Sequence, residues 1–192
     1  MRGGCVKFKQ FITVPNLLCY IRIALIPYFA YTYLHADRMT DYLYAAFLLA
    51  VMEITDFLDG FIARRYHMIT DVGKIIDPIA DKLLQLTLLV LLLYHYPSAA
   101  FVLALFLIKE ASMAVCGLLS IRKKCRLDGA LWCGKISTTV FYICMIVLIL
   151  FPKISPSAAD FLLCITACFL LYSFIVYMST YYKMLKKNSP LR

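Results

Sequence analysis

The stretch "TDFLDGFIARRYHMITDVGKIIDPIAD", from Thr55 to Asp81, decides how this sequence is interpreted. It lies between two strongly apolar segments, yet it contains five of the chain's eleven carboxylates. A charged side chain at the centre of a bilayer costs about 2.5–3.5 kcal/mol on insertion scales, and clustered carboxylates also repel one another. We therefore expect positive charge to lie among these side chains.

The composition of the whole chain indicates that its solvent is a membrane. The 192 residues are 63% hydrophobic and only 16% charged, whereas soluble domains are roughly one quarter charged. A helix of about 20 apolar residues crosses the hydrocarbon core of a bilayer. A helix also satisfies all of its backbone hydrogen bonds within its own segment, as the absence of water there requires. The sequence thus predicts an all-α integral membrane protein with six transmembrane helices. They are expected near residues 16–35, 41–64, 76–94, 98–121, 134–151 and 157–180.

The basic residues predict how the chain is oriented. We expect a basic interfacial arm at residues 1–15, a six-helix membrane domain at 16–182 and a polar cytoplasmic tail at 183–192. Lysine and arginine gather at both ends and in the second and fourth connections, while the opposite connections offer only Arg38 and Lys153. The positive-inside rule then places both termini and the acidic stretch in the cytoplasm. Charge spread over one membrane face favours anionic lipid headgroups as the partner and disfavours nucleic acid.

Helical spacing sorts the acidic stretch into two stripes, each on one helix face. The first stripe belongs to the second helix and consists of Asp56, Asp59, Gly60, Ala63 and Arg64. The second belongs to the third helix and consists of Gly73, Asp77 and Asp81. Two neighbouring helices therefore present two carboxylates each toward a common space. Thr70 and Asp71 are expected to cap the third helix.

Four inward carboxylates favour a site for hard divalent cations. Mg²⁺ and Mn²⁺ prefer carboxylate and water oxygens, whereas zinc prefers histidine and cysteine. Two such cations can bind a pyrophosphate and polarise its phosphorus. The small residues Gly60, Ala63 and Gly73 would let a bulky ligand approach the backbone.

Two other interpretations of these carboxylates stay open. They can be interfacial aspartates that end one helix and cap another. They can also line the path of a divalent-cation or proton transporter, since carboxylates within a membrane often mark ion pathways. Their clustering at one depth, with no relay of polar residues in the other helices, favours a site over a pathway.

The pattern D-x2-D-G-x2-A-R-x8-G-x3-D-x3-D, from Asp56 to Asp81, resembles the signature of the CDP-alcohol phosphatidyltransferase family. That resemblance implies a fold of six membrane helices, usually a homodimer, with the site open to the cytoplasm. It implies transfer of a phosphatidyl group from CDP-diacylglycerol to an alcohol, with release of CMP. A multi-pass location in a bacterial cell membrane is expected.

The resemblance also implies roles for individual residues. Asp56, Asp59 and Asp77 would hold two Mg²⁺ or Mn²⁺ ions, and Asp81 would complete the metal site and act as the general base on the acceptor hydroxyl. The pocket for the cytidine diphosphate group would be lined by Asp59, Gly60, Ala63, Arg64 and Gly73.

Three further segments resemble the family members whose acceptor is glycerol 3-phosphate: "VPNLLCYIRIALIP" from Val14, "DPIADKLL" from Asp77 and "GKISTT" from Gly134. Lys135, Arg22 and Lys109 are the candidates for contacting the acceptor phosphate. Alternatively, Arg22 pairs with a carboxylate, and Lys109 pairs with Glu110 or extends its charged end toward the membrane surface. The chain departs from those members at Cys19, Lys109 and Gly117, which keeps phosphatidylglycerol, the acceptor of the family's cardiolipin synthases, open as an alternative.

Overall fold

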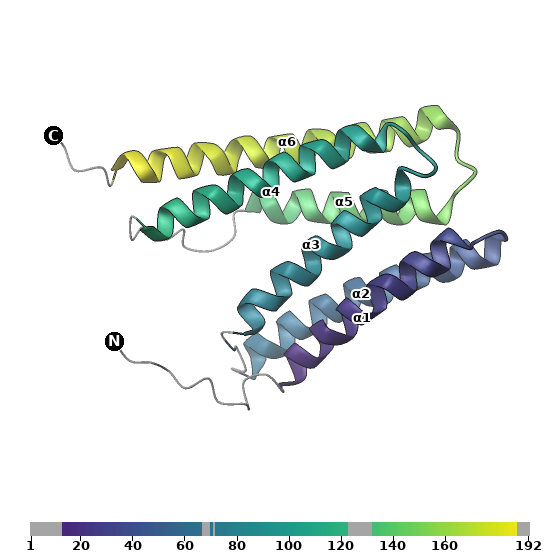
Figure 1. Cartoon of the computed structure of the whole chain (residues 1–192), viewed down its shortest axis with the longest axis horizontal. Coiled ribbons are helices and arrows are strands. Elements are labelled where there is room, and N and C mark those ends of the chain that lie inside the picture. Colours follow the sequence, from purple (N-terminus) through teal and green to yellow (C-terminus); the bar gives the residue numbers. More distant parts are fainter. Residues whose placement is uncertain (1–12, 67–69, 71, 123–131, 188–192) are drawn as a thin grey trace. The chain divides into compact units, whose positions relative to one another are not determined.

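The computed structural model describes residues 13–66, 70, 72–122 and 132–187, and within them the chain consists of α-helices without a strand (Figure 1). The predicted all-α fold is confirmed. Of the expected arm at residues 1–15, residues 1–12 lie outside the described residues, and Val14 and Pro15 already belong to the first helix. The last helix continues through the first part of the expected polar tail. The helices are α1 (Val14–Leu34), α2 (Met39–Arg65), α3 (Gly73–Leu92), α4 (Ala99–Arg122), α5 (Trp132–Leu150) and α6 (Pro156–Lys187).

Two compact units make up the described chain. The first contains α1, α2 and nearly all of α3, together with residues 149–152. The second contains α4, most of α5, and α6. The acidic stretch belongs entirely to the first unit, so the candidate site can be described from that unit's own helices.

Four of the described helices are long and apolar enough to cross a membrane, namely α1, α4, α5 and α6. The chain is accordingly an integral membrane protein. The 27 residues of α2 and the 20 residues of α3 would extend about 40 and about 30 Å at 1.5 Å per residue. Both helices contain too many charged residues to be identified as membrane-spanning from their composition, so it stays a prediction that they cross the membrane.

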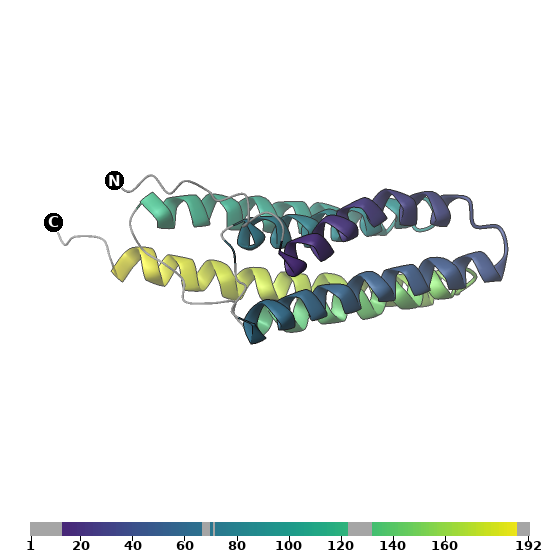
Figure 2. The same ribbon diagram turned by 90° about the horizontal axis from the view of Figure 1, so that it is seen from below.

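In the first unit, α1 and α2 pack side by side (Figures 1 and 2). A proline lies in the first turn of α1, where its missing N–H would have no helical partner in any case. The buried face of α1 changes character along the helix. Its first part is polar, with Asn16, Cys19 and Arg22, and its second part is apolar, with Ile26 and Phe29. Polar groups are thus concentrated near the start of α1.

In the second unit, α4 and α6 pack against each other, and the Sγ of Cys116 lies 3.9 Å from the Sδ of Met178. Near the start of α5, Gly134 leaves space for an α6 side chain. A Cβ there would lie 2.7 Å from the hydroxyl oxygen of Tyr177, so the ring of this tyrosine lies directly against the glycine.

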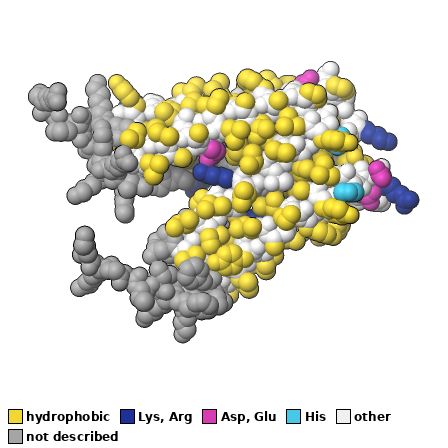
Figure 3. All heavy atoms as spheres, in the orientation of Figure 1, with side chains coloured by type: hydrophobic (Ala, Val, Ile, Leu, Met, Phe, Trp, Pro, Cys, Tyr) yellow, Lys and Arg dark blue, Asp and Glu magenta, His cyan; other side chains and the backbone are white. Residues whose placement is uncertain are grey.

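Large hydrophobic side chains point outward along several helices, including Ile21, Phe47, Phe101 and Phe161. Figure 3 shows hydrophobic side chains over most of the described surface on view. In water such a surface would promote association, but in a bilayer it faces lipid chains of the same polarity. The exposed surface therefore agrees with the predicted membrane environment.

Candidate active site

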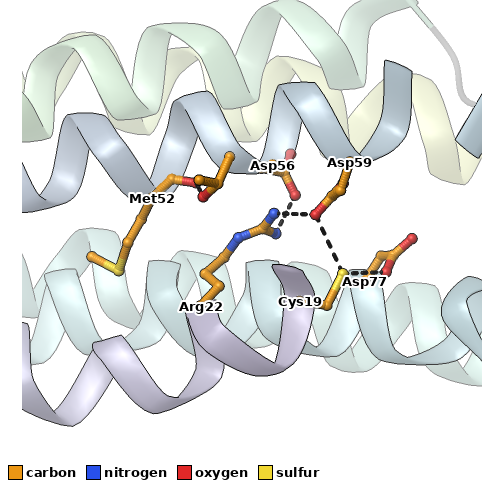
Figure 4. Close-up of polar contacts among 7 residues, drawn as sticks. Cys19, Arg22, Met52, Asp56, Asp59 and Asp77 are labelled. Atoms are coloured by element: carbon orange, nitrogen blue, oxygen red, sulfur yellow. Dashed lines mark hydrogen bonds and ion pairs between the residues drawn. The ribbon is translucent and has the colours of Figure 1, made fainter. Parts of the chain in front are cut away.

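Arg22 of α1 connects two of the predicted site carboxylates on α2. Its Nη1 donates to Oδ1 of Asp56, and its Nη2 donates to Oδ2 of Asp59 at 2.6 Å. Figure 4 shows both aspartates directed toward the same guanidinium group. The predicted shared face of Asp56 and Asp59 is therefore present in the fold. The exposed fractions differ, at 1% for Arg22, 4% for the Asp59 side chain and 41% for that of Asp56.

Cys19, one turn before Arg22, connects the same group to α3. Its Sγ lies 3.3 Å from Oδ2 of Asp59 and 2.7 Å from Oδ1 of Asp77. A thiol has one proton, so Cys19 donates to one of these carboxylates at a time. We call Cys19, Arg22, Asp56, Asp59 and Asp77 the carboxylate cluster. It joins α1, α2 and α3, as Figure 4 shows.

The charges of the carboxylate cluster do not balance. Three aspartates share one guanidinium and one thiol. A buried pair that loses one partner is destabilised by about 3–5 kcal/mol, because the remaining charge is left without compensation. Arg22 therefore stabilises Asp59 in the fold, and the cluster still has an excess of negative charge. An additional cation would be attracted to it.

The other predicted site residues lie close by in sequence on the same two helices. Asp81 lies one turn after Asp77 on α3 and is partly exposed. Gly60 and Ala63 follow Asp59 on α2 and are also partly exposed. Arg64 lies in the last turn of α2, and its side chain is outside what the structure describes.

Gly73 is buried where α3 begins, in contact with the start of α1. Its N–H donates to Oγ1 of Thr70 at 3.0 Å, and that hydroxyl donates to Oδ1 of Asn16 at 3.1 Å. The predicted cap by Thr70 is confirmed, while Asp71 lies outside the described residues. A Cβ at Gly73 would lie 2.7 Å from Oδ1 of Asn16. Glycine at this position thus allows the Asn16 side chain of α1 to pack against the start of α3. This is in addition to the role expected for Gly73 in the ligand pocket.

The two candidate acceptor-binding lysines lie in the second unit, each beside a neighbour on its own helix. Lys109 is buried, and its Nζ lies 2.9 Å from Oε1 of Glu110, the pairing that was its alternative. Lys135 is exposed, with its Nζ 5.2 Å from the ring centre of Trp132, a cation–π contact. Arg22 likewise makes the carboxylate pairing that was its alternative. The acceptor-binding roles of all three residues stay predictions.

Comparison with known proteins shows the family. Residues 12–176 match the family model of the CDP-alcohol phosphatidyltransferases. The chain belongs to this family. It is 32% identical over 173 residues to the CDP-diacylglycerol–glycerol-3-phosphate 3-phosphatidyltransferase of Escherichia coli strain K12, covering 86% of this chain and 93% of that protein. The enzyme of the same name from Rickettsia bellii is 44% identical over 80 residues, 42% of this chain and 44% of that protein.

For a CDP-alcohol phosphatidyltransferase, the residues of the carboxylate cluster fit a divalent cation in charge and in donor type. Carboxylate oxygens of α2 contact the buried guanidinium of Arg22, and one of α3 contacts the neighbouring Cys19 thiol. Such oxygens are the donors that Mg²⁺ and Mn²⁺ prefer. Across the described residues, no group of three or more His, Cys, Asp or Glu side chains is arranged to hold a metal ion. Metal binding therefore stays a proposal.

Asn16 and Cys19 were not among the predicted site residues, although both belong to the site region of this phosphatidyltransferase. Cys19 is fully buried between two carboxylates. Spacing in the sequence could have identified Asn16 and Cys19, because they and Arg22 follow one another at three-residue intervals on one helix face. Polar groups at that spacing in a membrane helix indicate a polar partner.

We expect Gly73→Ala to destabilise the protein by about 1–3 kcal/mol, because the added methyl group meets the Asn16 side chain in a closely packed contact. Thermal unfolding of the purified protein in detergent measures the change. Gly117→Ala is the matched control, since nothing lies within 4 Å of a Cβ there and alanine favours the helix. Equal melting temperatures for Gly73→Ala and the unmodified protein would contradict the close contact.

Proposed function

We propose that this chain transfers the phosphatidyl group of CDP-diacylglycerol to glycerol 3-phosphate, giving phosphatidylglycerophosphate and CMP. The observation that carries the proposal is the carboxylate cluster, which brings together three aspartates of the family signature. Asp56 and Asp59 contact the guanidinium of Arg22, and Asp77 contacts the thiol of Cys19. The relatives named for this reaction, with the Escherichia coli enzyme aligned over 93% of its length, support the choice of acceptor.

The reaction forms one P–O bond and breaks another. The acceptor hydroxyl oxygen attacks the phosphorus bonded to the diacylglycerol. The bond from that phosphorus to the oxygen it shares with the CMP phosphate breaks, and CMP leaves with the bonding electrons. The proton of the attacking hydroxyl goes to a carboxylate, and we propose that this carboxylate is Asp81. A positioned general base of this kind contributes typically 10²–10⁴-fold.

The carboxylates of the signature would hold the cofactor. Asp56, Asp59, Asp77 and Asp81 are the proposed ligands of two Mg²⁺ or Mn²⁺ ions. When bound, such ions stabilise the negative charge that develops on the pyrophosphate oxygens. The acidic side chains themselves would repel the substrate's phosphates, so an intervening cation is needed for binding as well as for the reaction.

The remaining predicted residues would bind the two substrates. Asp59, Gly60, Ala63, Arg64 and Gly73 are proposed to contact the cytidine diphosphate group, with the small residues admitting it and Arg64 offering a cation. Lys135 is the proposed contact for the phosphate of the acceptor, because it is exposed and matches the family position. Arg22 and Lys109 are weaker candidates for that contact, since both already pair with carboxylates.

The membrane arrangement is proposed from charge. Basic residues near both ends and around the acidic stretch support a cytoplasmic active site and cytoplasmic termini. Water-soluble glycerol 3-phosphate would then reach the site from the cytoplasm, and CDP-diacylglycerol from the inner leaflet of a bacterial cell membrane. We propose a homodimer in that membrane.

Release of CMP in detergent tests the proposal against transport. Purified protein with CDP-diacylglycerol, glycerol 3-phosphate and Mg²⁺ is expected to release CMP without any ion gradient. A transporter built on the same carboxylates would release none. Absence of CMP, together with Mn²⁺ uptake into vesicles that contain the protein, would contradict the proposed reaction and support the transporter interpretation.

A further inference from the structure

Arg22 makes its contacts to two of the aspartates that are proposed to bind the metal. The guanidinium bonds Oδ1 of Asp56 and Oδ2 of Asp59, and the second of these oxygens also lies 3.3 Å from Sγ of Cys19. A divalent cation binding to the same oxygens would come close to the positive guanidinium. Like charges at such a distance repel strongly where water is largely excluded. Arg22 and the metal therefore compete for the same two aspartates.

The environment of Arg22 allows its guanidinium to move away from the two aspartates. Its Nε is buried and has no hydrogen-bond partner among the described residues, so the guanidinium is not held at all of its nitrogens. One of its two partners, Asp56, is 41% exposed and accessible from outside the cluster. A fully satisfied buried arginine would normally bond through every N–H group.

We infer that Arg22 is an internal competitor of the divalent metal: its guanidinium pairs with Asp56 and Asp59 in the metal-free protein and leaves them when the metal binds. The inference rests on the proposed function, since it assigns a regulatory role within that same metal site. Its first consequence is that the metal-free protein stays folded, because Asp59 keeps a buried counterion. Its second consequence is weaker metal binding than the carboxylates alone would provide, since displacing Arg22 opposes binding.

The test measures Mn²⁺ binding to metal-free protein in detergent, by titration calorimetry and by the electron paramagnetic resonance signal of free Mn²⁺. Arg22→Gln removes the competing charge, and Arg22→Lys keeps a charge but loses the planar fork that contacts two carboxylates. We expect the Kd for Mn²⁺ to fall by about tenfold in Arg22→Gln, within the range usual for coupled sites, and by less in Arg22→Lys. If Arg22→Gln does not fold, tighter binding by Arg22→Lys supports the inference and unchanged binding overturns it.

Thermal unfolding provides a second readout that does not depend on activity. Without metal, Arg22→Gln is expected to melt at a lower temperature than the unmodified protein, because Asp59 loses its positively charged partner. Saturating Mn²⁺ should raise the melting temperature of the variant more than that of the unmodified protein, since binding stabilises by mass action. A variant that only damaged the structure would lose stability without tighter Mn²⁺ binding, and that result would overturn the inference.

Lys109→Gln is the matched control. It also removes a buried cation paired with a carboxylate, but Lys109 belongs to the second unit and pairs with Glu110. Its Mn²⁺ affinity should equal that of the unmodified protein. Mn²⁺ binding by the unmodified protein that neither Arg22 variant strengthens would overturn the competition and leave the proposed function standing. No Mn²⁺ binding by any of these proteins would overturn both.

Discussion

Asp81→Asn is expected to lower the rate of CMP release by about 10²–10⁴-fold, which is the contribution of a positioned general base. Asparagine has nearly the same shape as aspartate but accepts no proton, so the acceptor hydroxyl would remain a poor nucleophile. The Michaelis constant for CDP-diacylglycerol should change much less than kcat. Asp81 follows Asp77 by one turn of α3 and is partly exposed, which is compatible with access by a water-soluble acceptor.

Single-turnover release of CMP from purified protein measures this effect apart from product dissociation. Asp160→Asn serves as the control, because this aspartate is exposed on α6 and accepts a hydrogen bond from Ser98 that asparagine can also accept. The control is expected to retain the full rate. If Asp81→Asn released CMP within about threefold of the unmodified rate, Asp81 would not be the general base.

Removal of divalent cations is the second change with a large expected effect. Chelation should reduce CMP release by about 10³-fold or more, since metal ions supply several kcal/mol of charge stabilisation and each 1.36 kcal/mol is tenfold in rate. Added Mg²⁺ or Mn²⁺ should restore the rate. The fold should survive chelation, because Arg22 remains as a counterion to Asp56 and Asp59.

Activity and folding must therefore be followed together in the chelated protein. Helical content and melting temperature measure the fold, and CMP release before and after metal addition measures the activity. Undiminished release from protein shown to be free of metal would exclude a metal role in the reaction. Loss of activity that metal does not restore, with loss of helical content, would instead mean that the metal maintains the fold.

Most of the helical fold is predictable because hydrophobicity in a membrane protein is a strong, local signal. Long apolar runs identify α1, α4, α5 and α6, and helical spacing correctly places Asp56 and Asp59 on one face of α2. The capping role of Thr70 is also predictable, because it depends on a residue only three positions from the helix start. Each of these features is determined by residues close together in sequence.

The partners across helices are not predictable in the same way. Which side of α1 faces α2 depends on packing between segments that are distant in sequence. Arg22 therefore had two open interpretations, and the structure shows it on Asp56 and Asp59. The contacts of Cys19 are of the same kind, because its thiol meets two carboxylates from different helices. From the sequence, the small size of Gly73 could be explained only by the approach of a ligand. The contact between Gly73 and the Asn16 side chain exists only in the folded chain, so the sequence does not predict it.

The choice of acceptor is the central claim, and the lipid product tests it most directly. Purified protein with CDP-diacylglycerol and Mg²⁺ would be given glycerol 3-phosphate or phosphatidylglycerol in separate reactions, and the products would be identified by mass spectrometry. We expect phosphatidylglycerophosphate from glycerol 3-phosphate and no lipid product from phosphatidylglycerol. Cardiolipin from phosphatidylglycerol, with no product from glycerol 3-phosphate, would contradict the proposed function while leaving the family unchanged.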